Sequence, residues 1–284
     1  MFDPAQLAAL AAVHRRGSFD LAAADLHVTA SAISQRIKAL EEATGALLIR
    51  RDKPCTATDT GLRLIRHHDD IALLTQTLAD DLHLACGPAT LRIAINADSL
   101  ATWVIPALAA TPGFLYDIVI DDQDFSQGLL RSGEVTGAIT SHPGPLQGCD
   151  TVPLGHMTFH AAASPAYIAR WFPQGVTPDA LSHAPALRFN DKDRMQAQWA
   201  ARHGHHAPLQ CHRLASSHGF VDACLAGLGW AMNAAALVAP HLSTGALIDL
   251  GHPVDVPLYW QFNRLTARAT APLTRALRQA AYAL

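Results

Sequence analysis

Apolar residues at helical spacing open the chain. A helix-capping Asp followed by Pro predicts a helix over about residues 3–13, and Gly17 ends it. Apolar residues recur at helical spacing over 18–26, with Ser18 as the cap, and Thr29 caps a third helix that reaches about residue 44. Two short helices joined by a tight corner are typical of a helix-turn-helix, so DNA is the first partner to consider.

The predicted third helix has an apolar face for packing and a polar face for contact with DNA; the alternative is an ordinary three-helix surface. Its apolar face consists of Ala30, Ile33, Ile37 and Leu40. A major groove admits such a helix, whose short hydroxyl and amide side chains reach base edges while longer cations contact phosphates or guanine. A basic cluster follows in the position of a wing. The candidate DNA-binding residues are Thr29, Ser31, Ser34, Gln35, Arg36, Lys38, Arg50, Arg51 and Lys53.

A long helix is predicted next, from the Thr58 cap to about Leu84. Its apolar seam consists of Leu64, Ile71, Leu74, Leu78 and Leu82. An isolated rod of this length is not stable, so the seam predicts a partner helix and a homodimer or homotetramer. The alternative is a helix that packs on its own domain. Gly87 and Pro88 then end the helix at the clearest domain boundary of the chain.

From residue 91 the pattern changes to short apolar strands that alternate with helices. Strands are predicted at 91–95, 116–120 and 136–140, with helices from Ser99 and around 127–131. A second set begins near residue 164 and includes strands within 184–189, 210–215, 229–232 and 246–250, while 257–262 crosses back and a last helix covers 271–283. This alternation predicts an α/β domain with a parallel or mixed sheet.

Polar side chains follow the predicted strands, where open α/β sheets bind ligands. The helix start at Asp98 and Ser99 suits a carboxylate, because its backbone N–H groups are free, and Thr102 lies one turn on. Asp121 and Asp122 form an acidic cluster that suits an ammonium or guanidinium group. Each has a simpler explanation, as a helix cap or a solvated loop. The candidate effector-binding residues are Asp98, Ser99, Thr102, Asp121, Asp122, Thr140, Ser216 and Ser217.

Residues 17–61, GSFDLAAADLHVTASAISQRIKALEEATGALLIRRDKPCTATDTG, resemble the winged helix-turn-helix of the LysR-type transcriptional regulators. The resemblance implies an α-rich winged helix-turn-helix head over 1–58, a linker and dimerisation helix over 59–87, and an effector domain over 88–284 that is similar to periplasmic binding proteins. Its two α/β lobes would comprise about 88–162 with 263–284, and about 163–262. The resemblance also implies that the chain binds an operator in double-stranded DNA, works with RNA polymerase and is no enzyme.

Five further segments resemble the branch of this family that senses lysine and arginine and controls basic amino acid export. They are NADSLATWVIPAL, LRSGEVTGAI, FPQGVT, GALIDL and LYW. The chain departs from the pattern at Ala30, where the family has Gln or Pro, and at His218 and Asn190, where the branch has acidic residues. Both latter departures remove negative charge. The effector implied is therefore lysine or arginine, with histidine or a less basic metabolite as the alternative.

Composition excludes several other classes. Net charge is −3, so the basic character is local to the reading helix and wing. No apolar run is long enough for a membrane span and no signal-peptide start is present, which favours a cytoplasmic protein over a secreted solute-binding receptor. A nucleoid-type DNA organiser would need no crevice between lobes. No catalytic or cofactor motif occurs, and no metal is expected, since 203–206 and 67–68 are interpreted as surface histidines.

The five cysteines are odd in number and widely spaced, without a C-x-x-C pair. This pattern favours reduced thiols over a disulfide framework or a zinc site. Each thiol is therefore interpreted as structural. Redox sensing by Cys211 with Cys224 is the alternative hypothesis.

Overall fold

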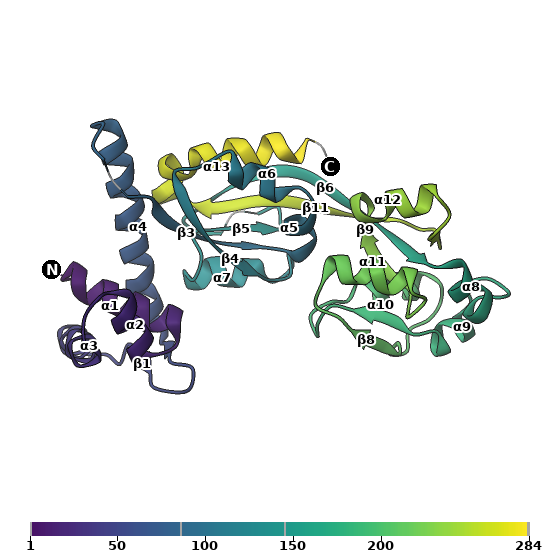
Figure 1. Ribbon diagram of the computed structural model, residues 1–284, viewed down its shortest axis with the longest axis horizontal. Coiled ribbons are helices and arrows are strands. Elements are labelled where there is room, and N and C mark those ends of the chain that lie inside the picture. The colour runs from purple at the N-terminus through teal and green to yellow at the C-terminus, as the bar shows by residue number, and fades with distance from the viewer. Residues whose placement is uncertain (1, 86, 145, 283–284) are drawn as a thin grey trace.

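A computed structural model of the 284-residue chain describes residues 2–85, 87–144 and 146–282. Three parts follow one another along the molecule, and Figure 1 shows the N-terminal head, then lobe 1, then lobe 2. A single helix, α4 (Asp59–Asp81), joins the head to lobe 1. This is the predicted arrangement of a winged helix-turn-helix head, a linker helix and a two-lobed α/β domain.

Three helices and a two-stranded wing make up the head. Asp3 caps α1 through the Ala5 N–H, and Gly17 ends it in the left-handed conformation at φ 64°. Thr29 caps α3, the predicted reading helix of the DNA-binding head, through the Ala32 N–H. Ser18 precedes the second helix but makes no side-chain cap. The elements are α1 (Pro4–Arg16), α2 (Phe19–Asp25), α3 (Ala30–Thr44), β1 (Ile49–Arg50) and β2 (Thr56–Ala57).

The wing is fixed to the helices at two points. The first is Gly17, whose carbonyl accepts the Cys55 N–H at 2.8 Å. The wing lies so close to Gly17 that a Cβ atom there would be 2.7 Å from Cβ of Pro54. At the second, the Glu41 carboxylate of α3 accepts the Leu48 N–H at 2.8 Å. The basic residues of the wing therefore keep a defined place beside the reading helix.

Helix α4 packs on both of its neighbours. Leu64 and Ile65 are buried in the core of the head, and Leu73 is buried in the core of lobe 1. Gln76 joins the same lobe, since it donates to the Gly113 carbonyl and accepts the Ala89 N–H. The prediction that Leu64 belongs to an intermolecular seam is wrong, because the head covers it.

A stripe of apolar side chains on the C-terminal part of α4 and on its cap residue is exposed to solvent. The stripe consists of Ile71, Leu74, Leu78 and Leu82, which are 44%, 41%, 57% and 57% exposed. Apolar side chains in such a row cost free energy in water, at about 25 cal/mol per Å² of apolar surface. The alternative of a helix packed wholly on its own domain therefore does not describe α4.

Lobe 1 is a sheet between helices. Strands β3 (Ala89–Ile95), β4 (Phe114–Ile120) and β5 (Gly137–Thr140) run parallel, with β3 in the middle. The helices are α5 (Ala97–Thr102), α6 (Val104–Ala109), α7 (Ser126–Ser132) and α13 (Ala267–Ala281), and a 3-10 turn spans Arg264–Thr266. The last helix thus returns to lobe 1, as predicted, but it begins four residues earlier than the expected start at residue 271.

Two long antiparallel strands connect the lobes: β6 (Cys149–Ala163) and β11 (Val254–Asn263). The far end of β6 pairs with β9 of lobe 2, whereas Tyr259–Phe262 of β11 pair with β5 of lobe 1. The chain therefore crosses between lobes a few residues before the predicted boundaries at 163 and 262. The sheet is mixed, and its order is β10-β6-β11-β5-β3-β4 with β9 beside β6.

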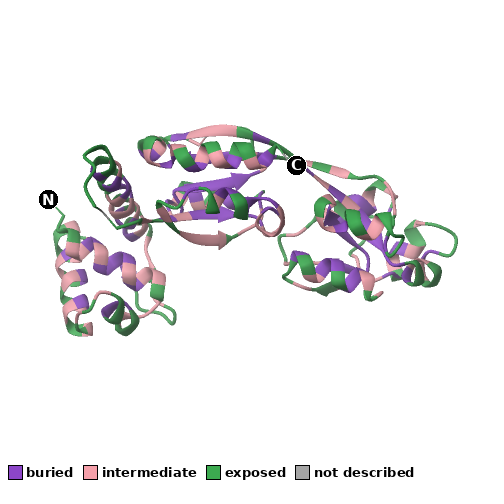
Figure 2. Ribbon diagram, turned by 45° about the horizontal axis from the view of Figure 1, so that its top comes forward, coloured by how far each residue is buried: buried purple, intermediate pink, exposed green. Residues whose placement is uncertain are grey.

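Lobe 2 places small strands among five helices. Its largest fully buried side chains are Trp199 and Trp230, whose ring centroids lie 4.9 Å apart. Figure 2 shows the buried residues gathered on the strands of each lobe, with exposed residues on the outer helices. The elements are α8 (Pro165–Trp171), α9 (Pro178–His183), β7 (Ala186–Arg188), α10 (Met195–Arg202), β8 (Cys211–Arg213), α11 (Ser217–Leu225), β9 (Ala231–Ala234), α12 (Ala235–Ser243) and β10 (Ile248–Asp249).

Candidate functional site

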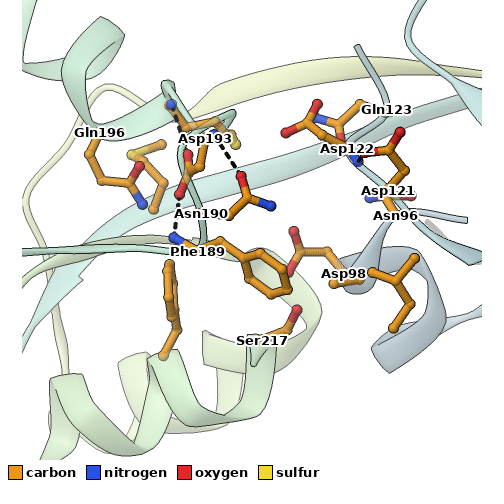
Figure 3. Close-up of a pocket in the computed structure, with 15 residues that line it drawn as sticks. Asn96, Asp98, Asp121, Asp122, Gln123, Phe189, Asn190, Asp193, Gln196 and Ser217 are labelled. Carbon is orange, nitrogen blue, oxygen red and sulfur yellow. Dashed lines mark hydrogen bonds between the residues drawn. The ribbon is translucent and has the colours of Figure 1, made fainter. Parts of the chain in front are cut away.

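A pocket lies between the two lobes, at the carboxyl ends of β3 and β4. It holds about 610 Å³ of space, part of which opens to solvent. Figure 3 shows side chains from both lobes converging on it. Lobe 1 contributes Asn96, Ala97, Asp98, Ile120, Asp121, Asp122 and Gln123, and lobe 2 contributes Phe189, Asn190, Asp193, Met195, Gln196, Ser217, Phe220 and Met232.

Four carboxyl groups line this pocket: Asp98, Asp121, Asp122 and Asp193. The ion pair of Asp121 with Lys192 neutralises one of them in part. The others have no cation in ion-pair distance among the described residues. The arrangement therefore concentrates negative charge where little protein charge balances it, which favours a cationic group of a ligand.

The environment of three of these carboxyl groups disfavours their ionised forms. Burial raises the pKa of Asp98. The nearby Ser217 hydroxyl lowers this pKa, and the negative charge of Asp193 raises it further. Burial likewise raises the pKa of Asp122, against the Asp124 N–H that donates to it at 2.9 Å, and the neighbouring carboxylates add to the rise. Burial also raises the pKa of Asp193. A bound cation would stabilise the ionised forms of these carboxyl groups.

The lobe 2 wall of the pocket is a loop that its own side chains hold in place. Asn190 Oδ1 accepts the backbone N–H groups of Lys192 and Asp193 at 2.8 and 3.2 Å. Asp193 in turn accepts the N–H groups of Phe189 and Met195 at 2.9 and 3.1 Å. Asn190 therefore shapes this loop. It carries a neutral amide at the position where the resemblance implies an acidic residue.

Several buried polar atoms at the pocket lack a partner among the described residues. They are Asn96 Oδ1, Gln196 Oε1 and Ser217 Oγ, while Ser99 Oγ is buried behind the lining. Buried polar groups are nearly always hydrogen-bonded in native proteins, so three such atoms around one cavity call for an explanation. Asn96 also leaves the start of α5 without a side-chain cap. A polar ligand in the pocket accounts for this pattern.

The structure brings four of the eight predicted effector residues to the pocket: Asp98, Asp121, Asp122 and Ser217. The other four lie apart from its lining. Ser99 is fully buried behind it, and Thr140 is fully buried where it donates to the Gln123 carbonyl. Thr102 donates to the Asp98 carbonyl, and Ser216 caps α11 through the Gly219 N–H.

Sequence reasoning noted Asn190 as a departure that bears on the effector, but it did not predict that residues 189–196 form a wall of the pocket. The segment supplies Phe189, Asn190, Asp193, Met195 and Gln196 to the pocket. The signal available was the charged run N-D-K-D-R directly after a short apolar strand. Nothing in the run itself shows that the second lobe faces the acidic loop at 121–122.

The predicted DNA-binding residues of the head are exposed or half-buried on α3 and the wing. Ser31, Gln35 and Lys38 are exposed on α3, and Ser34 and Arg36 are half-buried. Lys38 pairs loosely with Glu42 one turn on, at 3.7 Å, and its side chain is 75% exposed. In the wing, Arg50, Arg51 and Lys53 are exposed, and the Arg51 guanidinium lies 5.0 Å from the centre of the Phe19 ring.

The histidines and cysteines call for one correction. His205 was expected on the surface with its neighbours, but it is buried, and its ring nitrogen contacts the Pro178 carbonyl at 3.1 Å. Cys55, Cys149, Cys211 and Cys224 are free thiols, while Cys86 lies outside the described residues. Cys224 is buried, and burial raises its pKa to about 12. Within the described ranges, no three His, Cys, Asp or Glu side chains gather as metal ligands.

The described helices include no segment of the length and apolar character that crossing a bilayer requires.

Two family profiles together match nearly the whole chain. Residues 4–62 match the bacterial regulatory helix-turn-helix protein, lysR family, and residues 87–283 match the LysR substrate binding domain. The transcriptional regulator LysG of Mycobacterium tuberculosis is 40% identical over 99% of this chain and 94% of its own length.

Two solved structures are similar over the full length. The crystal structure of ArgP from Mycobacterium tuberculosis has a TM-score of 0.83 and 40% identity, and it covers 100% of this chain and 98% of its own. Full-length LysG from Corynebacterium glutamicum with bound effector Arg has a TM-score of 0.70 and 35% identity, over 99% of this chain and 98% of its own. This chain belongs to the LysR family of bacterial helix-turn-helix transcriptional regulators.

Proposed function

We propose that this regulator senses a free basic amino acid, arginine or lysine, in the pocket between its lobes, and that it controls an amino acid exporter or a metabolic gene. The observation that carries the proposal is the convergence of Asp98, Asp121, Asp122 and Asp193 on one cavity. Their charge suits a cation, and a charge-assisted hydrogen bond contributes about 1.5 to 3 kcal/mol. The arginine bound to the regulator of Corynebacterium glutamicum supports the same class of effector.

The cationic end of the effector would lie against Asp121 or Asp122. Both follow β4 in lobe 1 and line the pocket, and Figure 3 shows Asn190 and Asp193 of lobe 2 on its other side. Asp122 already accepts the Asp124 N–H with one oxygen, which holds its carboxylate in place and leaves the other oxygen for a ligand. A guanidinium or ammonium group can then bind without a large rearrangement of the loop.

The carboxylate end would lie toward the start of α5. Asn96 makes no side-chain cap there, so the first N–H groups of the helix are free to donate. The Ser217 hydroxyl of lobe 2 also lines the pocket and has no partner among the described residues. An anionic group at this place would accept hydrogen bonds from the helix N–H groups and from Ser217.

The head would read a dyad-symmetric operator as part of a homodimer or homotetramer. In this arrangement Ser31, Ser34 and Gln35 face base edges, while Arg36, Lys38 and the wing cations face phosphates. The uncovered stripe of α4 would pack against its copy in the partner and set the spacing of the two heads. Contact with RNA polymerase would follow from the position of the heads at a promoter.

Calorimetry with two matched variants tests the proposed effector. Asp122→Asn should weaken arginine binding by about 10- to 100-fold, because about 1.4 kcal/mol corresponds to tenfold in affinity. Asp124→Asn is the control, since it removes the same charge from the same loop, and Asp124 points to Ser141 outside the pocket. The assignment of the cation to Asp122 fails if the two variants bind arginine equally, and the whole proposal fails if the parent chain binds a neutral or acidic metabolite instead.

A further inference from the structure

Lys192 connects the two lobes beside the pocket. It belongs to the lobe 2 loop between β7 and α10, and its ammonium pairs with the Asp121 carboxylate of lobe 1. The same ammonium lies 5.1 Å from the centre of the Phe125 ring, which is also in lobe 1. The side chain therefore ties the lobe 2 wall of the pocket to the lobe 1 segment that follows β4.

The backbone that carries Lys192 is held from several sides. Asn190 accepts the Lys192 N–H at 2.8 Å, so the loop turns just before this residue. The next anchor is Asp191, which accepts from Arg213 at 2.6 Å. On the other side, the Asp193 carboxylate accepts the Met195 N–H. A loop fixed in this way presents its one lysine in a defined direction, which is toward lobe 1.

Asp121 is the acceptor that a ligand's cation would also use. Its carboxylate lines the pocket and its side chain is 12% exposed, while the Lys192 side chain is 46% exposed and has room to swing into solvent. A single carboxylate oxygen already accepts both the Lys192 ammonium and the Asp122 N–H at this place. A second cation at the same oxygen would meet like-charge repulsion.

We infer that Lys192 is an internal competitor of the effector: in the ligand-free protein it holds the cation position at Asp121, and the cationic end of the ligand displaces it. The inference rests on the proposed function for the identity of the ligand. The competition has two consequences. First, the apparent affinity for the ligand is lower than the intrinsic affinity, in proportion to the fraction of molecules in which Asp121 is free. Second, the bound ligand breaks the contact of Lys192 between the lobes.

The link between the lobes is tested without any ligand. Fluorophores placed through noncanonical amino acids at Gln147 of lobe 1 and Gln174 of lobe 2, both exposed, report the distance between lobes by single-molecule energy transfer. Lys192→Met should lengthen or broaden this distance, and Lys192→Arg should leave it as in the parent. An identical distribution for Lys192→Met and the parent would overturn the inference.

The competition is tested by titration with L-arginine. Lys192→Met should bind arginine about 3- to 10-fold more tightly than the parent, and the gain should vanish in an Asp121→Asn background. Arg194→Met is the matched control, because it removes an exposed cation from the same loop that has no ion-pair partner among the described residues. Unchanged or weaker binding by Lys192→Met would overturn the competition. A parent that binds no arginine or lysine would overturn the proposed function, and the distance measurement would still decide the link.

Discussion

At the scale of single residues, the carboxyl groups of the pocket are costly to the ligand-free protein. Burial raises the pKa of Asp98, Asp122 and Asp193 above the values expected in an unfolded chain. The folded chain then holds these protons to higher pH, so the free energy of unfolding falls as pH rises from the ordinary pKa through the raised one. A bound cation favours the ionised forms, and arginine binding should strengthen over the same range.

Asp98→Asn should therefore stabilise the ligand-free chain near neutral pH. The amide removes a desolvated charge beside Asp193, and a gain of about 1 kcal/mol would raise the melting temperature by about 2 to 4 °C. The variant should also show a weaker fall of melting temperature as the pH rises from about 4, the ordinary pKa of an Asp carboxyl, because one titrating group is gone. Thermal unfolding over this range measures both effects, with Asp124→Asn as the charge control. A melting temperature below that of the parent at neutral pH would contradict the electrostatic explanation.

At the scale of elements, periodicity identified the helices of the head and α4 well, because capping and apolar spacing are local. It failed at Leu64, whose burial depends on how the head folds back onto α4. It also missed β6, since Pro153 and Gly155 interrupt a strand that changes partners between the lobes. Of the predicted effector residues, those that directly follow β3 and β4 lie at the pocket. The lobe 2 wall could not be predicted, because no local pattern reports which loop faces another lobe.

The stripe on α4 makes a prediction about assembly. Replacing Leu74 and Leu78 together by Asp puts unpaired carboxylates into an apolar helix contact, which costs several kcal/mol in such a contact. The variant should be monomeric by light scattering and should bind operator DNA at least tenfold more weakly, since two linked heads gain from effective concentration. Leu228→Asp is the control, because this leucine is 43% exposed and lies in lobe 2. A double variant with the mass of the parent assembly would exclude the stripe as the contact between copies.

At the scale of the whole molecule, β6 and β11 are the two strands through which one lobe can move against the other. The end of β11 lies close to the linker, where Asn263 donates to both carboxylate oxygens of Asp70 on α4 at 3.0 and 3.1 Å. Arg15 of the head pairs with Asp69 one residue earlier. These contacts connect the end of β11 through α4 to the head.

The most direct test of the proposed effector is calorimetric titration of the full chain with arginine, lysine and citrulline, the neutral analogue of arginine. Four carboxyl groups around one cavity predict saturable binding of arginine or lysine, with citrulline at least tenfold weaker, because the neutral urea group lacks the charge that the pocket selects. Citrulline binding as tight as arginine binding, or binding of an acidic metabolite without any response to arginine, lysine or histidine, would contradict it.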